Sequence, residues 1–314
     1  MRRATYVIAL AMAIFFLARQ FFRASSHQAV SAAASEPSPK RSETVRVAAV
    51  QCYSSMGKVT LNRRMLTDLI MQAAQKGAKI VVLPECAVQG YMEPNSDTKW
   101  CINADPERNE KSVEDAAESV PGPSTHYFAA LSQKLGIYLA LPLIEQDQGH
   151  YFNTLLLLDP HGRIAAHHRK FCFWAPGDSG WATEGSGKAC VVATEYGRLG
   201  LMICYDVHGM PSRLKAARAD IVLYAVGWYG PHTENWFRDI FPRRYVTPNQ
   251  FAVVAANWSA DDLENSTWEG VGYSCVIARD AQVLAMASTS EPEIVIADVP
   301  VSGKIGEDSE NQDE

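Results

Sequence analysis

The sequence predicts an α/β domain, and three observations support this fold class. Short apolar segments recur along the chain with turn signals between them, as buried strands do. A stretch with helical spacing separates the first two segments. The segments are almost continuously apolar, which indicates a sheet covered on both faces, since a sheet with one face in water shows alternation. At 314 residues, the chain can bury a sizeable core.

The expected strands are the apolar segments themselves. They occupy residues 45–51, 80–84, 138–144, 153–158, 198–204, 221–225 and 251–257. A helix is expected over residues 61–76, where Leu61, Met65, Leu69, Ile70 and Ala73 fall near helical spacing and Gly77 follows as a stop.

Further helices are expected over residues 124–135, with Ser124 as a cap, and over 211–218. Residues 235–246 also have a helical pattern, but Pro242 should kink that helix or begin a new turn. Residues 93–123 are long, polar and weakly patterned, which is typical of a functional loop or a flexible insertion.

The amino terminus differs in character from the rest. Met1, Arg2 and Arg3 precede an apolar run, which predicts a signal peptide or an uncleaved signal anchor within residues 1–34. As an anchor, residues 6–22 would form a membrane tether, and either alternative predicts an extracytoplasmic domain. Residues 35–44 have linker composition, the folded domain should span 45–302, and the acidic tail 303–314 is expected to be disordered.

Charge and cysteine content exclude two classes of protein. The formal net charge is −6, and because residues 1–34 carry four arginines and no acid, the remainder stands at −10. Such a chain repels phosphate backbones, so no nucleic acid partner is expected. The seven cysteines form no C-x-x-C pair and no regular framework, so no disulfide scaffold is expected.

Three residues capable of chemistry lie where apolar segments end, which is where α/β sheets place their ligand sites. Glu85 follows V-V-L-P, Lys170 ends H-H-R-K, and Cys204 ends L-G-L-M-I-C. Singly, each has a plainer explanation as a cap, a surface charge or a packing residue. Together, a carboxylate, an ammonium and a thiol would form a charged, thiolate-favouring pocket.

Residues 45–300 resemble the nitrilase superfamily of carbon–nitrogen hydrolases in several motifs that occur in the family's order. The motifs are V-R-V-A-A-V-Q at 45–51, G-A-K-I-V-V-L-P-E with Q-G-Y at 77–91, H-R-K at 168–170, G-R-L-G-L-M-I-C-Y-D at 197–206 and N-Q-F-A-V-V-A-A-N at 249–257. The resemblance implies a four-layer α-β-β-α sandwich, normally paired with a second copy, so we expect a homodimer or a higher homo-oligomer.

The resemblance also implies a Glu85–Lys170–Cys204 triad, with Glu85 as base and Cys204 as nucleophile. In the mechanism that these residue types suggest, Lys170 and the Tyr205 backbone N–H stabilise the oxyanion. The family commonly has a second acid after the lysine, and here that acid is either Asp178 or Glu184. No metal and no organic cofactor is expected.

The expected substrate is a small amide. The Tyr205–Asp206 pair resembles the amidase branches, whereas nitrile or N-carbamoyl hydrolysis and acyl transfer to an amine are the alternatives. Trp228 and Tyr229 should border the substrate pocket, with Tyr91 covering it from the other side.

Other interpretations of these residues are less favoured. His208 would allow a Cys–His dyad with Cys204, but spacing alone does not establish contact. His167, His168 and Cys172 would allow a metal site, but adjacent strand residues point to opposite faces. A catalytically silent binding module is disfavoured because all three catalytic residue types are present.

Overall fold

The computed structural model describes residues 43–92, 98–260 and 271–301. The expected signal segment 1–34, most of the linker 35–44 and the acidic tail 303–314 lie outside the described residues. The first strand begins at Thr44, one residue before the predicted start of the domain. Within the described part of the chain, no helix is long and apolar enough to cross a membrane.

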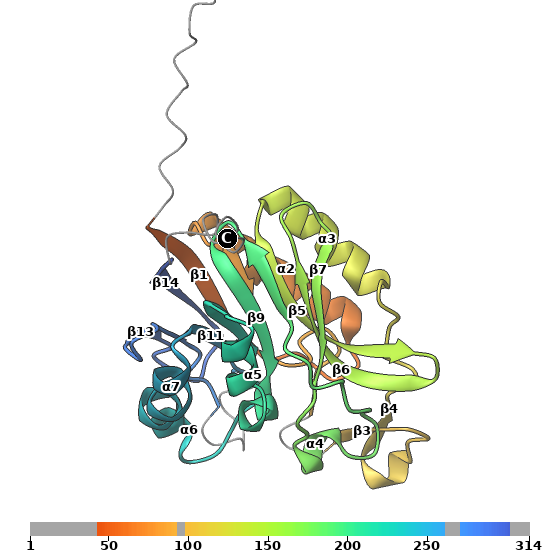
Figure 1. Ribbon diagram of the computed structural model, residues 1–314. Coiled ribbons are helices and arrows are strands. Elements are labelled where there is room, and N and C mark those ends of the chain that lie inside the picture. The colour runs from red at the N-terminus through yellow and green to blue at the C-terminus, as the bar shows by residue number, and fades with distance from the viewer. Residues whose placement is uncertain (1–42, 93–97, 261–270, 302–314) are drawn as a thin grey trace, which may run out of the picture. The chain divides into compact units, whose positions relative to one another are not determined.

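The described residues form two six-stranded sheets and a small two-stranded one. The first large sheet has the order β14-β1-β2-β5-β6-β7 (Figure 1), in which β1, β2 and β5 are parallel. Its strands are β1 (Thr44–Gln51), β2 (Ile80–Val82), β5 (Tyr138–Asp147), β6 (His150–Leu158), β7 (Ile164–Arg169) and β14 (Glu293–Pro300).

The second sheet has the order β13-β12-β11-β10-β9-β8, with β9, β10 and β11 parallel. Its strands are β8 (Val191–Thr194), β9 (Gly197–Ile203), β10 (Ile221–Ala225), β11 (Ala252–Ala256), β12 (Cys275–Ile277) and β13 (Val283–Met286).

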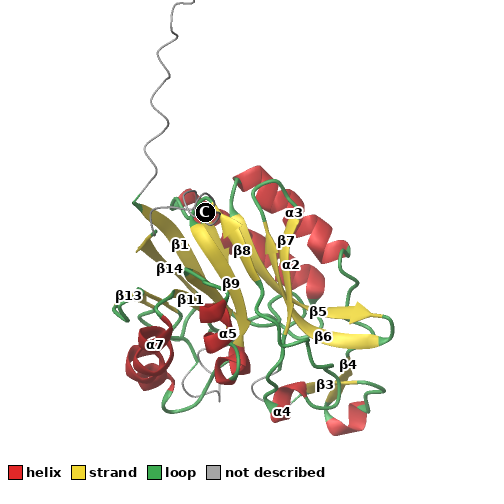
Figure 2. Ribbon diagram, in the orientation of Figure 1, coloured by secondary structure: helices red, strands yellow, loops and turns green. Residues whose placement is uncertain are grey.

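The two sheets pack face to face, and helices cover their outer faces (Figure 2). Val47 and Val82 of the first sheet meet Leu201 and Leu223 of the second in one apolar cluster. Helices α2 (Val59–Gln75) and α3 (Pro123–Leu135) cover the first sheet, whereas α5 (Pro211–Ala216) and residues 233–249 cover the second. The predicted four-layer α-β-β-α sandwich is confirmed.

The buried face of α2 differs from the predicted one. Its buried residues are Asn62, Leu66, Ile70 and Ala73, while Leu61 is 58% exposed. The prediction was right for Ile70 and Ala73, but it named Leu61, Met65 and Leu69 where the structure buries Asn62 and Leu66. Asn62 is tolerated in the core because its side-chain amide donates to the carbonyls of Ser55 (2.8 Å) and Val88 (3.0 Å).

The helical stretch at residues 233–249 continues through Pro242 in wider, π-type turns. It consists of α6 (Thr233–Asn235), η3 (Trp236–Ile240), η4 (Pro242–Val246) and α7 (Thr247–Asn249). Pro242 begins the second π-type turn, so the new turn, not the kink, is the alternative that the structure adopts. At the first position of a turn, the missing proline N–H breaks no hydrogen bond of that turn.

Part of the long segment 93–123 is regular, although residues 93–97 lie outside the described range. Strands β3 (Lys99–Cys101) and β4 (Glu110–Ser112) pair, with the short turn η1 (Pro106–Arg108) between them. Trp100 is buried and its indole N–H donates to the Gly90 carbonyl at 3.0 Å. A flexible insertion was therefore the wrong alternative for this part, which packs onto the domain.

Candidate active site

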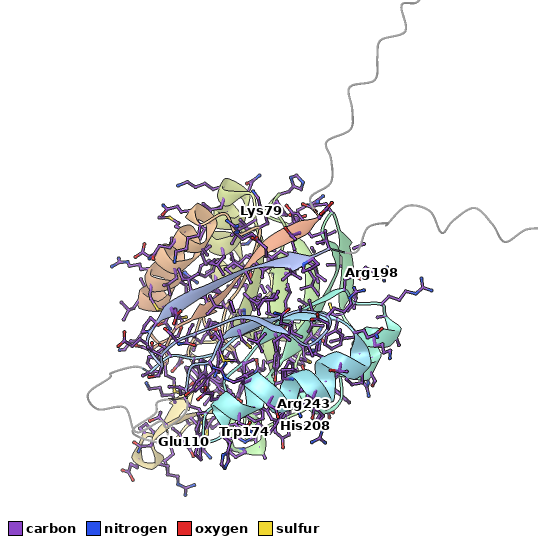
Figure 3. All side chains as sticks on the ribbon, turned by 90° about the vertical axis from the view of Figure 1, so that its left-hand side faces the viewer. Lys79, Glu110, Trp174, Arg198, His208 and Arg243 are labelled. Carbon is purple, nitrogen blue, oxygen red and sulfur yellow. The ribbon has the colours of Figure 1, made fainter. Side chains whose placement is uncertain are left out.

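The candidate catalytic residues meet where strands of both sheets end. Glu85 follows β2, Lys170 follows β7, and Cys204 opens the short turn η2 (Cys204–His208) after β9. Figure 3 shows Trp174 and His208 at this end, while Lys79 and Arg198, near the starts of β2 and β9, lie at the opposite end. Segments distant in sequence therefore deliver their side chains to one edge of the sandwich.

Lys170 lies between two carboxylates in the interior. Its Nζ is 2.8 Å from Glu85 Oε1 and 2.7 Å from Asp178 Oδ2, and all three side chains are fully buried. Burial by itself would lower the pKa of Lys170, but the charges of Glu85 and Asp178 outweigh it and raise that pKa well above its usual range. The lysine is therefore a fixed positive charge.

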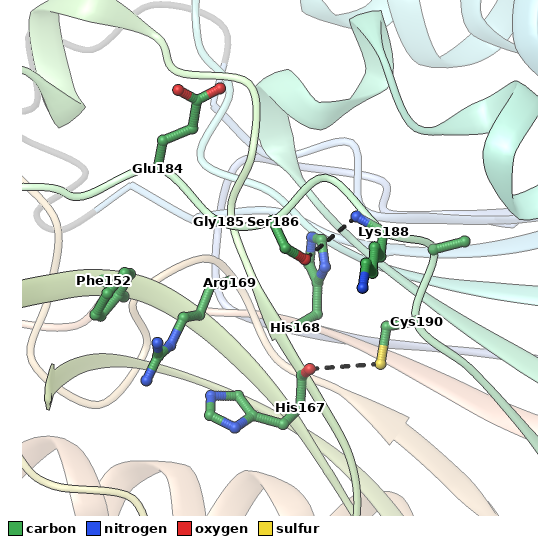
Figure 4. Close-up of a pocket in the computed structure, with 10 residues that line it drawn as sticks. Phe152, His167, His168, Arg169, Glu184, Gly185, Ser186, Lys188 and Cys190 are labelled. Atoms are coloured by element: carbon green, nitrogen blue, oxygen red, sulfur yellow. Dashed lines mark hydrogen bonds between the residues drawn. The ribbon is translucent and has the colours of Figure 1, made fainter.

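Asp178, not Glu184, accompanies the lysine. The one-turn helix α4 (Ala175–Asp178) folds the chain back, and the Trp174 backbone N–H donates to Asp178 Oδ2 at 2.8 Å. Glu184 instead borders a separate cavity of about 460 Å³ beside β7, where Figure 4 shows its carboxylate directed away from His167. The alternative of Glu184 as the second acid was wrong because the turn returns only Asp178 to Lys170.

Cys204 occupies a backbone conformation that is rare for a side chain larger than hydrogen. Its φ is +36°, and such conformations persist only where surrounding contacts hold them. The Tyr224 hydroxyl donates to the Cys204 carbonyl at 2.7 Å, and the Cys204 Sγ lies 3.9 Å from the Gly227 carbonyl. Burial, reinforced by the charge of Glu85, raises the pKa of the Cys204 thiol well above its usual range. The resting sulfur is therefore a thiol.

The two carboxylate oxygens of Glu85 differ in their hydrogen bonding. Oε1 accepts from Lys170 and, at 2.7 Å, from the Asn153 side-chain amide, whereas Oε2 has no hydrogen-bond partner among the described residues. A methyl group built on Gly227 would lie 2.9 Å from Oε2, so this oxygen faces the glycine whose carbonyl is near the Cys204 sulfur. Burial, together with Asp178, raises the pKa of Glu85.

Sequence reasoning missed Asn153, which lies in β6. Its amide also donates to Asp178 Oδ1 at 3.3 Å, so one side chain orients both carboxylates. The available signal was an amide side chain directly before the apolar run T-L-L-L-L, at the start of an expected strand.

Tyr91 supports the carboxylates, and it is not among the residues that line the substrate cavity. Its hydroxyl donates to Asp178 Oδ1 at 2.8 Å, and its buried ring contacts Trp258 at a centroid distance of 5.3 Å. Trp258, which sequence reasoning also missed, donates from its indole N–H to the Glu85 carbonyl at 3.1 Å. The expectation that Tyr91 covers the substrate pocket is therefore corrected: its hydroxyl is bound to Asp178, and Tyr91 is not among the described residues that line the cavity.

The cavity that opens onto the cysteine has a volume of about 240 Å³. Of the expected pocket residues, Trp228 and Tyr229 line it, and so does Tyr205. Trp174, which was not predicted, completes the wall. The pocket is therefore largely aromatic, and Cys204 is part of its lining.

The side chains of His208, His167 and His168 contact groups other than Glu85, Lys170 and the Cys204 sulfur. His208 packs against the Tyr205 ring at 4.3 Å, and no contact pairs it with the Cys204 sulfur in the described residues. His167 binds Glu145 and His168 binds Asp206, so the two rings diverge as expected for neighbours on a strand. In the described part of the chain, no group of His, Cys, Asp and Glu side chains could hold a metal ion.

The four-layer sandwich, with thiol, carboxylate and ammonium gathered at one strand edge, defines an enzyme of the nitrilase superfamily. Residues 46–304 match the carbon–nitrogen hydrolase family model, and the chain belongs to this family.

Relatives and solved structures agree with this assignment. Omega-amidase NIT2 of Bos taurus is 30% identical over 268 residues, covering 82% of this chain and 88% of the relative. The Danio rerio omega-amidase NIT2 is 30% identical over 263 residues, covering 81% and 87%.

Two solved structures share the fold. An amidase from Nesterenkonia sp. superposes with a TM-score of 0.66 at 23% identity, covering 83% of this chain and 92% of that one. Saccharomyces cerevisiae Nit3 gives a TM-score of 0.65 at 23% identity, covering 84% and 92%. In a mutant of the Nesterenkonia sp. AN1 amidase, the acetamide moiety of fluoroacetamide is covalently added at the active-site cysteine.

Proposed function

We propose that this protein hydrolyses the carbon–nitrogen bond of a small amide through an acyl-thioester on Cys204. One observation carries the proposal: Glu85 Oε2, which has no hydrogen-bond partner among the described residues, faces Gly227, whose carbonyl lies 3.9 Å from Cys204 Sγ, while the Lys170 ammonium binds the other oxygen of Glu85. The relatives named omega-amidase and amidase support an amide as substrate.

The first half-reaction transfers the acyl group to sulfur. Glu85 Oε2 accepts the thiol proton as Cys204 Sγ attacks the amide carbon, and the carbonyl oxygen becomes an oxyanion. Lys170 and the Tyr205 backbone N–H stabilise that charge. The protonated Glu85 then gives its proton to the nitrogen, the carbon–nitrogen bond breaks, and ammonia or an amine leaves.

The second half-reaction returns the enzyme to its resting state. Glu85 removes a proton from water, and the resulting hydroxide attacks the thioester carbon. Collapse of the tetrahedral intermediate breaks the carbon–sulfur bond, and the proton held by Glu85 returns to the sulfur. The products are a carboxylic acid and the free thiol, and every proton transfer uses a group of this site or the water.

Ammonia release from a panel of simple amides tests the proposal. Wild-type protein should release ammonia, Cys204→Ala should lower the rate at least 10³-fold, and mass spectrometry should detect an acyl adduct on Cys204 during turnover. Cys190→Ala is the matched control, because Cys190 borders the separate cavity, and it should retain the wild-type rate. Undiminished turnover by Cys204→Ala would refute the proposal.

We also propose that the domain acts outside the cytoplasm, either after cleavage of a signal peptide or tethered through residues 6–22. The charged start and the apolar run that follows it support this location. Amino-terminal sequencing of exported protein distinguishes the alternatives, since cleavage removes Met1 and an anchor retains the apolar run. A protein confined to the cytoplasm would contradict both.

We propose a homo-oligomer on the basis of the family resemblance. Light scattering at micromolar concentration tests it: a mass of twice 34.6 kDa or more, less any cleaved segment, is expected, and a monomer would contradict it.

A further inference from the structure

The lining of the substrate cavity carries information about the acyl group of the substrate. Apart from Cys204 and Gly227, the lining residues that the structure describes are all aromatic: Trp174, Tyr205, Trp228 and Tyr229. The inference drawn from them rests on the proposed function, since it concerns the substrate of the same site.

One wall of the cavity is rigid. The Asn257 side chain accepts from the Trp228 N–H and donates to the Trp228 carbonyl, both at 2.8 Å. The Trp228 ring stacks on Trp236 at 4.5 Å with an interplanar angle of 13°. Because the Asn257 hydrogen bonds fix the Trp228 backbone and the Trp236 ring fixes its side chain, Trp228 loses little conformational entropy when a ligand packs on it.

A second part of the lining is tied to the catalytic cluster. The backbone N–H of Trp174 donates to Asp178, the carboxylate that also binds Lys170. The Trp174 ring meets Tyr229 edge-on, at 5.8 Å and 86°. The position of this aromatic pair is therefore tied to the reacting groups, and a planar group packed against it would be positioned relative to Cys204.

Among the described residues that line the cavity, none has an acidic or basic side chain. His208 packs against the Tyr205 ring, and burial together with the charge of Arg244 lowers the pKa of this histidine, which disfavours its cationic form. A substrate with a carboxylate remote from its amide would lose hydration here without gaining a cation from the lining residues. The lining therefore disfavours acyl groups that bear a second charge.

The volume of the cavity indicates how large an acyl group it can hold. A closed apolar cavity of about 150 Å³ holds one benzene molecule. The volume here, about 240 Å³, leaves room for one ring and the attached carboxamide. We propose that the substrate is an uncharged amide whose acyl group carries a single aromatic ring.

Ligand binding to full-length Cys204→Ala protein, measured by calorimetry, tests the proposal without depending on catalysis. The probes are phenylacetamide, acetamide and succinamate, which share the amide and differ in the rest of the acyl group. Phenylacetamide should bind at least tenfold more tightly than either of the others. A smaller preference, including no measurable binding of phenylacetamide, would overturn the proposal, as would tighter binding of succinamate.

Variants in the Cys204→Ala background show whether the preference comes from this cavity. Trp228→Ala and Tyr229→Ala should each reduce the preference for phenylacetamide at least threefold, and Trp228→Phe should restore part of it. Tyr229 is 37% exposed, so its truncation should leave the fold intact even if Trp228→Ala unfolds. Tyr127→Ala, on the outer surface of α3, is the matched control and should leave the preference unchanged. A preference that survives both cavity truncations would overturn the assignment.

The two proposals fail in different ways. If wild-type protein releases ammonia from no amide while the Cys204→Ala variant prefers phenylacetamide, the hydrolytic function is refuted and the binding preference stands. If amides are hydrolysed but succinamate or acetamide is the better ligand, the substrate class is refuted and the hydrolytic function stands.

Discussion

His168 and Asp206 are joined by a 2.7 Å contact in the interior, which links strand β7, directly before Lys170, to the turn that begins at Cys204. The other oxygen of Asp206 accepts from the backbone N–H groups of Phe171 and Cys172, at 2.9 and 2.8 Å. Oδ2 also accepts from the Ile203 N–H at 3.1 Å. Asp206 thus fixes the relative position of the ammonium and the nucleophile although it touches neither.

Asp206→Asn should destabilise the protein and slow turnover. An amide offers one acceptor oxygen in place of two, so at least one buried N–H group loses its partner, at a cost of about 1–3 kcal/mol. Urea unfolding and ammonia release measure the two effects. The exposed Asp68→Asn is the control. Wild-type stability and rate in Asp206→Asn would show that the carboxylate does not hold the two segments.

Asp178→Asn should move the acidic limb of the pH profile of kcat/KM to lower pH. Glu85 must be ionised to act as base, so activity is lost as pH falls through its pKa. That pKa is raised by burial and further by the charge of Asp178, so removing the charge lowers it. Glu184→Gln is the matched control and should leave the limb in place. A shift to higher pH in Asp178→Asn would contradict this electrostatic account.

Glu85→Gln should lower the pH at which Cys204 becomes reactive toward iodoacetamide. The thiol pKa is raised mainly by burial and secondarily by the negative charge of Glu85, and the substitution removes the second cause. The midpoint of the labelling rate against pH, read from the Cys204 peptide by mass spectrometry, should therefore fall. Labelling of Cys190 in the same sample supplies an internal control. An unchanged Cys204 midpoint would show that Glu85 does not influence the sulfur.

Acid should destabilise the fold through Glu145. Although burial opposes ionisation, hydrogen bonds from His167, Arg169 and Thr154 lower the pKa of this carboxyl from 4.5 to about 2. Its stabilisation is therefore present above pH 4.5 and lost as pH falls toward 2. Denaturant unfolding between pH 6 and 2 should show this loss. Glu145→Gln should be less stable at pH 6 and lose less on acidification, and equal slopes would contradict the assignment.

The sequence by itself determined the layers of the fold and the three residues proposed for catalysis. Apolar runs, such as the one that became β10, and the helical spacing before Gly77 are local signals, because a buried strand or a packed helix requires a particular order of neighbouring residues. Strand β7 was not among the expected apolar strands because only half of I-A-A-H-H-R is apolar, as is tolerated at the edge of a sheet.

Only the tertiary structure decided which polar groups meet. Asp178 and Glu184 were equivalent candidates along the chain, and the choice between them depended on how α4 turns. Asn153 joins Glu85 across 68 residues, and no local pattern encodes a contact at that separation. Hydrogen bonds and ion pairs depend on distances of about 3 Å, which arise only after the sheets have stacked and their strand ends have come together.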